Sequence, residues 1–189
     1  MRYILLLLVT TSMFGLNINS SLLKVHATLV PKLYLMDYQH KKKIENNSIV
    51  IALVSSRLDC KSALLLKNEM NLKYKKGLKS YDLEIKNVLY SDIGDINANI
   101  YYLFPTDAKN IRKAIEKADK NRAVTFSYLE DDLKYGVMIS LNIGHKVKPI
   151  LNLDAIRLYD ISFRPILLNI SSVYKIDSVA DRYLNKKVL

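Results

Sequence analysis

The sequence has few of the residues that build reactive or metal sites: it contains one cysteine, three histidines, five glycines and no tryptophan in 189 residues. A single cysteine, Cys60, excludes an intramolecular disulfide. The histidines stand far apart, at His26, His40 and His145, and no C-x-x-C or H-x-x-x-H pair occurs, so we expect no zinc site. A P-loop, a G-x-G-x-x-G segment and a G-x-S-x-G elbow are also missing, which leaves nucleotide binding and serine hydrolysis without support. We therefore expect no cofactor.

One long apolar run is present, "YILLLLVTTSMFGL" behind Arg2. A membrane-spanning helix needs ~20 apolar residues, so this run has the length of a signal-peptide core instead. We assign residues 1–20 to a signal peptide with cleavage between Asn17 and Ser21, or to an uncleaved anchor. No cysteine follows the run, which excludes a lipoprotein. In either case we expect the body of the chain to be exported, to the periplasm of a Gram-negative bacterium.

Acidic residues are outnumbered, with 18 Asp and Glu against 29 Lys and Arg, a formal net charge of +11. Export makes nucleic acid an unsuitable partner. An acidic protein surface or anionic lipid head groups would complement this charge. The alternative interpretation is a lysine-rich, solvated surface that binds nothing.

Apolar strands alternate with helices through the first two thirds of the chain. The periodicity predicts helices over 20–38, 57–74 and 108–120, and strands over 48–54, 80–89, 98–105 and 122–128. This β-α-β-β-α-β order predicts a mostly parallel sheet. Residues 135–152 add a β-hairpin at one edge, turned at "NIGHK", and helices follow over 153–160 and 164–172. We expect one three-layer α/β domain with helices on both faces, over residues 21–175, and a tail or helix over 176–189.

Ligands of parallel α/β sheets bind beyond the carboxyl ends of the strands. The polar residues expected at that edge define a candidate ligand crevice, formed by Ser55, Ser56, Pro105, Thr106, Ser127 and Tyr128. The nearby acids Glu130 and Asp131 are the best candidates for general acid and base, but they have no nucleophile or metal partner. They are otherwise helix-capping acids in a loop.

Three further positions have structural interpretations. Cys60 lies on the apolar side of the helix predicted over 57–74, so we expect a small core residue. Gly136 would permit close approach of the backbone where the chain enters the hairpin. Asn152 stands just before a helix and is placed to cap it.

The segment from 122 to 171 resembles the C-terminal half of the YfiR-like (YfiR/HmsC) family of periplasmic proteins. The matching features are Thr125 and Ser127 at a strand end, the acidic "LEDD", then Gly136 with Met138 and Ile139 at the hairpin, and finally Ile150 to Asn152, Ala155 and "ISFRPILL". The "KVHATLVPKLYLM" helix is also similar to the lead helix of that family. The lead helix here lacks the family's Phe-Trp-Pro-like ending.

The resemblance implies a regulatory protein. Family members can repress an inner-membrane diguanylate cyclase by binding its periplasmic sensor region, which lowers cyclic di-GMP and biofilm output. We therefore expect a non-enzymatic regulator with such a signalling protein as its partner; self-association as a homodimer stays open. The alternative is a periplasmic small-ligand-binding module that uses the crevice and feeds a membrane sensor or transporter, and an enzyme using Glu130 and Asp131 is the third hypothesis.

Overall fold

The computed structural model describes residues 18–175. The predicted signal peptide lies outside the described residues up to residue 17, and so does the predicted tail over 176–189. Within the described range, no helix is long and apolar enough to cross a membrane.

One seven-stranded sheet organises the chain, in the order β2-β1-β3-β4-β5-β6-β7. Strands β1 to β5 run parallel to one another, and β6 is antiparallel to β5. Their bounds are β1 Ser48–Ser55, β2 Asp82–Leu89, β3 Ile100–Leu103, β4 Val124–Ser127, β5 Ile139–Ile143, β6 Val147–Leu151 and β7 Ser172–Val173. The mostly parallel α/β sheet expected from the sequence is confirmed.

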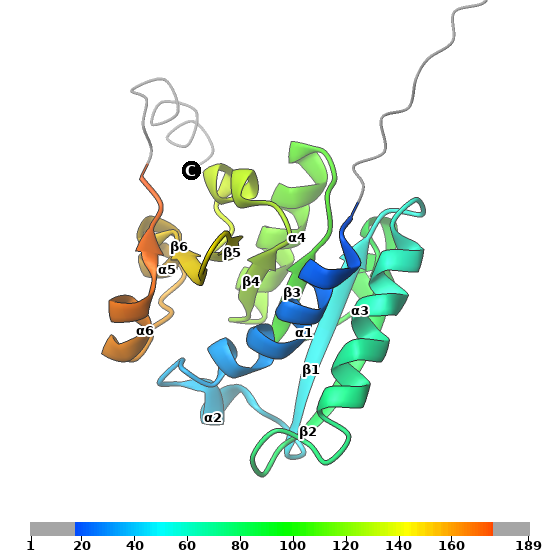
Figure 1. The fold of residues 1–189 in the computed structure, drawn as a ribbon, viewed down its shortest axis with the longest axis horizontal. Coiled ribbons are helices and arrows are strands. Elements are labelled where there is room, and N and C mark those ends of the chain that lie inside the picture. The colour runs from blue at the N-terminus through cyan, green and yellow to red at the C-terminus, as the bar shows by residue number, and fades with distance from the viewer. Residues whose placement is uncertain (1–17, 176–189) are drawn as a thin grey trace, which may run out of the picture.

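Helices cover both faces of this sheet (Figure 1). They are α1 Ser20–Tyr34, α2 His40–Lys43, α3 Cys60–Lys73, α4 Ala108–Lys120, α5 Leu153–Leu158 and α6 Pro165–Ile170, with 3-10 helices η1 Tyr90–Asp95 and η2 Glu130–Tyr135. Side chains of α1, α3, α5 and α6 share one core cluster. Those of α4, η1 and η2 share the other. The domain therefore has three layers.

The central strand β1 shows why the sheet needs cover on both faces. Its Ile49, Ile51 and Leu53 enter the core beneath α1 and α3, whereas Ala52 and Val54 enter the core beneath α4. Successive side chains of a strand point to opposite faces. A continuous run of apolar residues is therefore stable here only between two helical layers.

The hairpin of β5 and β6 lies at one end of the sheet, as expected, and one further short strand lies outside it. The two-residue strand β7 pairs with β6 in parallel, Ile150 with Ser172 and Leu151 with Val173. The hairpin strand also begins at Ile139 rather than at residue 135, because η2 occupies residues 130–135. A strand of two residues carries no periodicity, so sequence alone could not identify β7.

The expectation for Cys60 was wrong. This residue is the first of α3 and is exposed, with Sγ 3.4 Å from the carbonyl oxygen of Ser56. The core positions of α3 are Ala63, Leu66 and Met70, which places Cys60 off the buried stripe.

Candidate functional site

The carboxyl ends of β1, β3 and β4 lie side by side, as expected for the predicted crevice. Val54 pairs with Leu103, and Leu103 pairs with Ser127. The chain continues in register beyond β3 and β4, because Phe104 donates its backbone N–H to the Val54 carbonyl (2.9 Å) and Tyr128 donates to the Leu103 carbonyl (3.0 Å). The structure thus gathers the predicted crevice residues at one edge of the sheet.

Two of these residues use their hydroxyl groups locally. Ser56 Oγ donates to Asp59 Oδ2 at 2.7 Å, next to the start of α3. Thr106 Oγ1 accepts from Asn110 Nδ2 at 3.2 Å, in the first turn of α4. Asp107 is the N-cap of α4, with its carboxylate 2.8 Å from the Asn110 N–H. These contacts stabilise helix starts, while Pro105 is half-buried and Ser55 is buried.

Tyr90 lies at the topological switch point between β1 and β3. Its hydroxyl donates to the Phe104 carbonyl at 2.6 Å, and its ring is buried against Val54 and Leu103 in the core beneath α4. Burial raises the pKa of this phenol far above its ordinary value, with smaller contributions from nearby carboxylates. The Tyr90 side chain therefore fills the position at which doubly wound sheets commonly bind a ligand.

The most connected polar group at this edge is the Ser127–Asp132 pair. Ser127 Oγ donates to Asp132 Oδ2 and accepts from the Leu129 N–H at 3.1 Å. The Ser127 carbonyl accepts from Ser140 Oγ at 3.1 Å, which joins β4 to β5. All three polar side chains are buried. The sequence pointed to Glu130 and Asp131 as the candidate acids of this segment, yet both are exposed. The acid that η2 directs into the interior is Asp132.

Burial raises the pKa of Asp132, more than the Ser127 hydrogen bond lowers it. A carboxyl group with a raised folded-state pKa is destabilising once ionised, so this cost is absent at low pH and appears as pH rises through the folded-state pKa. We expect Asp132→Asn, which can still accept from Ser127, to gain stability relative to the wild type as the pH is raised from acid to neutral. Urea unfolding of both proteins across that range measures the difference. A constant difference at all pH values would contradict the expectation.

A second buried group links the lead helix to the sheet. Tyr102 of β3 and His26 of α1 are hydrogen-bonded, Oη to Nδ1 at 3.0 Å, and the Tyr128 ring stacks on the His26 ring with centroids 5.6 Å apart. The Tyr128 hydroxyl accepts from the Asn19 N–H at 3.1 Å, beside the start of α1. Burial lowers the pKa of His26 from 6.5 to about 4. The imidazole is therefore neutral at pH 7, and Tyr128 serves to position α1.

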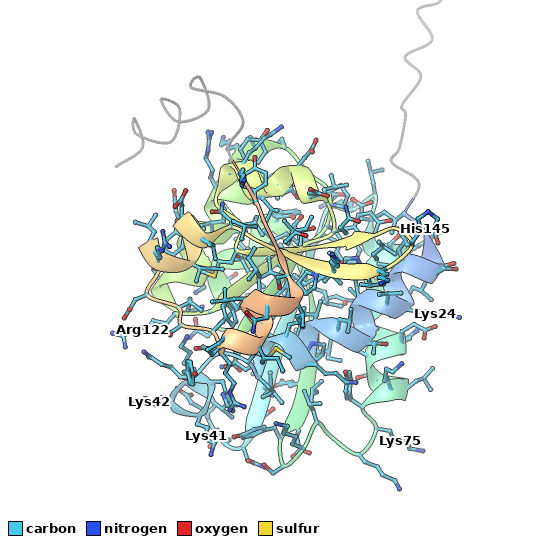
Figure 2. All side chains as sticks on the ribbon, turned by 60° about the vertical axis from the view of Figure 1, so that its left-hand side comes forward. Lys24, Lys41, Lys42, Lys75, Arg122 and His145 are labelled. Carbon is cyan, nitrogen blue, oxygen red and sulfur yellow. The ribbon has the colours of Figure 1, made fainter. Side chains whose placement is uncertain are left out.

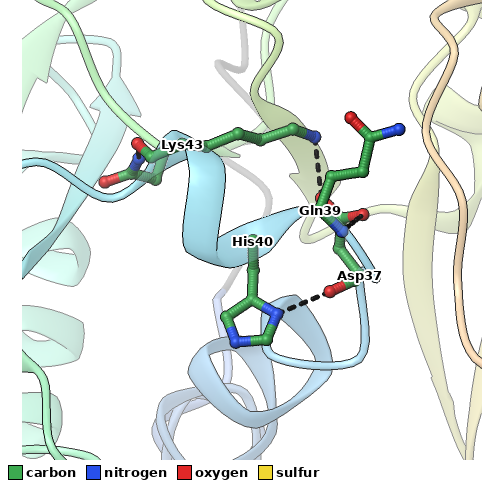
Figure 3. A network of polar contacts seen from close by, with 5 residues as sticks. Asp37, Gln39, His40 and Lys43 are labelled. Atoms are coloured by element: carbon green, nitrogen blue, oxygen red, sulfur yellow. Dashed lines mark hydrogen bonds and ion pairs between the residues drawn. The ribbon is translucent and has the colours of Figure 1, made fainter.

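A third group connects α1 with α2 (Figure 3). Lys43 Nζ lies 2.7 Å from Asp37 Oδ2, with side-chain exposures of 9% and 0%. Asp37 Oδ1 accepts from the Gln39 N–H at 2.9 Å, and His40 Nδ1 lies 2.6 Å from the Asp37 carbonyl oxygen. This lysine-rich segment is polar in sequence and would be expected to be fully solvated. It instead contains a buried ion pair.

Within residues 18–175, the hydrogen bonds of these groups are mostly structural. Ser127 donates to the buried Asp132 carboxylate and has no histidine among its hydrogen-bond partners in the described chain. His145 is exposed in the hairpin turn. Among residues 18–175, no three His, Cys, Asp or Glu side chains are grouped so that they could hold a metal ion.

A cavity of about 370 Å³ lies at the other end of the strands, away from the predicted crevice. It lies at the amino ends of β1, β3 and β4, and its lining is rich in amides: Lys43, Glu45, Asn46, Ser48, Val50, Glu84, Asn97, Ala98, Asn99 and Asn121. Both polar atoms of the Asn99 side chain are hydrogen-bonded: the oxygen accepts from the Val50 N–H (2.7 Å) and the nitrogen donates to the Lys43 carbonyl (2.6 Å). A second cavity, of about 490 Å³, lies between η2, β5, β6 and the β7 segment. Neither cavity is lined by a residue of the predicted crevice.

Met138 and Asn152 stabilise the hairpin from inside. The Met138 N–H donates to Thr125 Oγ1 at 2.9 Å, and its side chain is buried. Asn152 is the N-cap of α5: its Oδ1 accepts from the Ala155 N–H at 3.0 Å, while its Nδ2 donates to the Leu133 carbonyl at 2.7 Å. One side chain therefore fastens both α5 and η2.

We expect Asn152→Ala to lower the free energy of unfolding by about 2 kcal/mol, roughly 1 for the lost cap and 1 for the lost bond to the Leu133 carbonyl. Chemical denaturation measures this. Asn142→Ala is the control, because that exposed amide makes only a 3.4 Å contact with Glu130. Unchanged stability combined with loss of partner binding would instead make Asn152 a functional residue.

Gly136 is needed for its backbone conformation and not for close approach, which corrects the sequence-based interpretation. It ends η2 with φ of 104°, and an added Cβ would meet only the Ile115 Cδ1 atom at an ordinary 3.6 Å. Such positive φ values strain residues that carry a side chain.

We therefore expect Gly136→Ala to cost about 1–3 kcal/mol. Gly144→Ala in the hairpin turn is the matched control, since its φ is not positive and an added Cβ would have room. Thermal unfolding of both variants provides the comparison. Equal losses for the two would show that φ is not what requires glycine at 136.

The fold defines a class, a three-layer α/β domain with a mostly parallel sheet. The sequence matches no protein-family model and no curated protein.

Several solved structures are similar in fold, and two of them are as follows. One is a conserved domain protein from Vibrio cholerae O1 biovar El Tor, with TM-score 0.58 and 13% identity over 81% of this chain and 60% of that one. The other is an ABC domain in complex with L-Trp from Streptococcus pneumoniae, with TM-score 0.50 and 11% identity over 75% of this chain and 60% of that one. This chain thus spans about three fifths of each. At these identities the likeness concerns the fold alone.

Proposed function

We propose that this protein is a non-enzymatic periplasmic regulator that binds and represses the periplasmic sensor region of an inner-membrane diguanylate cyclase. The observation that supports the proposal is that the polar side chains at the carboxyl ends of the strands have structural roles. The side chains that would carry chemistry there, Ser56, Thr106 and Ser127, each hold a neighbouring element in place. The resemblance of residues 122–171 to the YfiR-like family supplies the partner.

Crosslinking in intact cells tests this proposal. The full chain, tagged at its C-terminus and expressed at native level, is crosslinked and purified from solubilised membranes. We expect a membrane diguanylate cyclase with a periplasmic domain to be recovered, and an unrelated exported protein carrying the same tag not to recover it. Recovery of no signalling enzyme under efficient crosslinking would overturn the proposal.

The amide-lined cavity at the amino edge favours a second candidate function, a periplasmic small-ligand-binding module. The solved ABC domain with a similar fold was crystallised with L-Trp, so amino acids are the first ligands to test. Cavities of 300–1,000 Å³ are typical of small-molecule sites, and the amino-edge cavity falls in this range.

A thermal-shift screen with amino acids and other periplasmic metabolites tests the ligand-binding candidate, since a ligand that binds the native state raises the melting temperature. Two variants then locate the site: Asn97→Leu fills the amino-edge cavity, and Thr106→Leu fills the predicted crevice at the carboxyl edge. Loss of the shift in only one variant assigns the ligand to that edge. If no metabolite raises the melting temperature of the wild type, the ligand-binding candidate is wrong.

A further inference from the structure

The short helix α6 exposes most of its apolar side chains. Only Leu167 is buried, whereas Ile166, Leu168 and Ile170 are 59%, 45% and 48% exposed. Ile166 and Ile170 are four residues apart and share one helix face. Scattered single apolar side chains are normal on a protein surface, but neighbouring ones mark a surface that contacts something else.

An exposed tyrosine lies beside the start of this helix. The Tyr38 N–H donates to the Ser162 carbonyl at 2.8 Å, and the Arg164 N–H donates to the Met36 carbonyl at 2.9 Å. These bonds hold the connection between α1 and α2 against the connection between α5 and α6. Tyr38 is 57% exposed and extends the apolar surface of α6.

Positive charge flanks the same surface along the chain. Lys41 and Lys42 of α2 are exposed, as is Arg164, the residue before α6. Across residues 18–175, the carboxylates lie beyond ion-pair distance of all three, whereas the neighbouring Lys43 is paired with Asp37. Figure 2 shows Lys41 and Lys42 projecting outward from the body of the domain.

We propose that this surface docks on an anionic phospholipid membrane; we call it the α2–α6 face and define it by Tyr38, Lys41, Lys42, Ile166, Leu168 and Ile170. The aliphatic side chains would enter the boundary between head groups and acyl chains, and the lysines would reach the anionic head groups. Tyrosine is favoured at the same depth, because its ring is apolar and its hydroxyl polar. The inference does not depend on the identity of any protein partner.

Two features favour lipid over an acidic protein as the occupant. Lysine is depleted in protein–protein interfaces, where arginine is enriched, but it binds well to anionic membranes. Protein interfaces also place their anchoring side chains in pockets, and neither cavity described above is lined by a residue of α6. A fluid bilayer requires no such matching shape.

Site-specific fluorescence tests the proposal with the full chain, whatever the N-terminal segment contributes to membrane binding. In a Cys60→Ser background, an environment-sensitive dye is attached through Leu168→Cys on α6 or, as the control, through Leu72→Cys on α3. Leu72 is 75% exposed, and α3 and α6 lie on opposite sides of the domain in Figure 1. With vesicles of phosphatidylglycerol and phosphatidylcholine, we expect a blue shift and quenching by a lipid-borne quencher at position 168 only.

The charge requirement is tested with a matched pair of double variants. Lys41→Gln with Lys42→Gln is expected to weaken the vesicle response at position 168 about thirtyfold, as for two lysines at an anionic surface. Lys75→Gln with Lys76→Gln, beyond the end of α3, removes the same charge and should change it less than about twofold.

Equal responses at positions 168 and 72, or equal effects of the two lysine pairs, would overturn the proposal. So would an absence of any vesicle response in a protein with wild-type melting behaviour, which would leave an acidic protein as the occupant of this face. Failure of the crosslinking experiment would bear only on the diguanylate cyclase, because the vesicles contain no protein.

Discussion

Lys43→Met is expected to lower the free energy of unfolding by about 3–5 kcal/mol, because it leaves the Asp37 carboxylate buried without its cation. Asp37 is fully buried and its other carboxylate oxygen is held by the Gln39 N–H, so the charge cannot turn toward water without breaking the α1–α2 connection. For a domain of this size we expect the melting temperature to fall by about 10 °C or more. Chemical denaturation with circular dichroism measures the change.

The surface pair of Lys86 and Glu84 is the matched control for this experiment. Its atoms are 2.9 Å apart, close to the 2.7 Å of the buried pair, but its side chains are 45% and 52% exposed. Exposed ion pairs contribute about 0–1 kcal/mol, so Lys86→Met should cost less than about 1 kcal/mol. Replacing both partners, with Asp37→Leu and Lys43→Met together, should recover much of the loss. Similar effects of Lys43→Met and Lys86→Met would show that burial does not govern the ion pair.

Acidification is expected to remove about 2–3 kcal/mol of stability through His26 between pH 6.5 and about 4. Burial lowers the pKa of this imidazole from 6.5 to about 4, so the folded state binds the proton less tightly than the unfolded chain. The contribution is fully present above pH 6.5 and is lost as the pH falls through this window. Tyr102 and Tyr128 contact the ring, and desolvation by burial is the cause of the lowered pKa.

His26→Gln isolates this contribution, since glutamine can still hydrogen-bond Tyr102 but does not titrate. Unfolding by urea at pH 7 and at pH 4.5 is compared for both proteins, and the difference between them removes the effects of other groups, including Asp132. We expect the stability advantage of the wild type over the variant to shrink by about 2–3 kcal/mol on acidification. Parallel stability curves would contradict the buried, neutral state of His26.

The sequence was sufficient for the four parallel strands β1 to β4, because they have clear apolar patterns. The run "SIVIALV" predicts a strand covered on both faces, and β1 is such a strand. Asn152 could also be identified, because a capping residue acts over three positions along the chain. Its second bond, to the Leu133 carbonyl, joins elements 19 residues apart and has no sequence signal.

The polar core could not be predicted in the same way. Lys41, Lys42 and Lys43 are three consecutive lysines, and no sequence pattern distinguishes them. Only the turn of α2 directs Lys43 inward to Asp37. In "EDD", the 3-10 helix η2 buries Asp132 and leaves Glu130 and Asp131 exposed. The predicted strand order brings the crevice residues to the carboxyl ends of neighbouring strands, but it could not anticipate that Tyr90 would lie at the switch point.

The central claim, that this chain represses a diguanylate cyclase, is tested most directly by cyclic di-GMP in the source cell. The nucleotide is quantified by mass spectrometry in a strain lacking the gene and in the same strain complemented with the full chain. We predict that cyclic di-GMP rises on deletion and returns to the wild-type level on complementation. Unchanged cyclic di-GMP in the deletion strain, with the protein confirmed to be present in the wild type, would contradict the account.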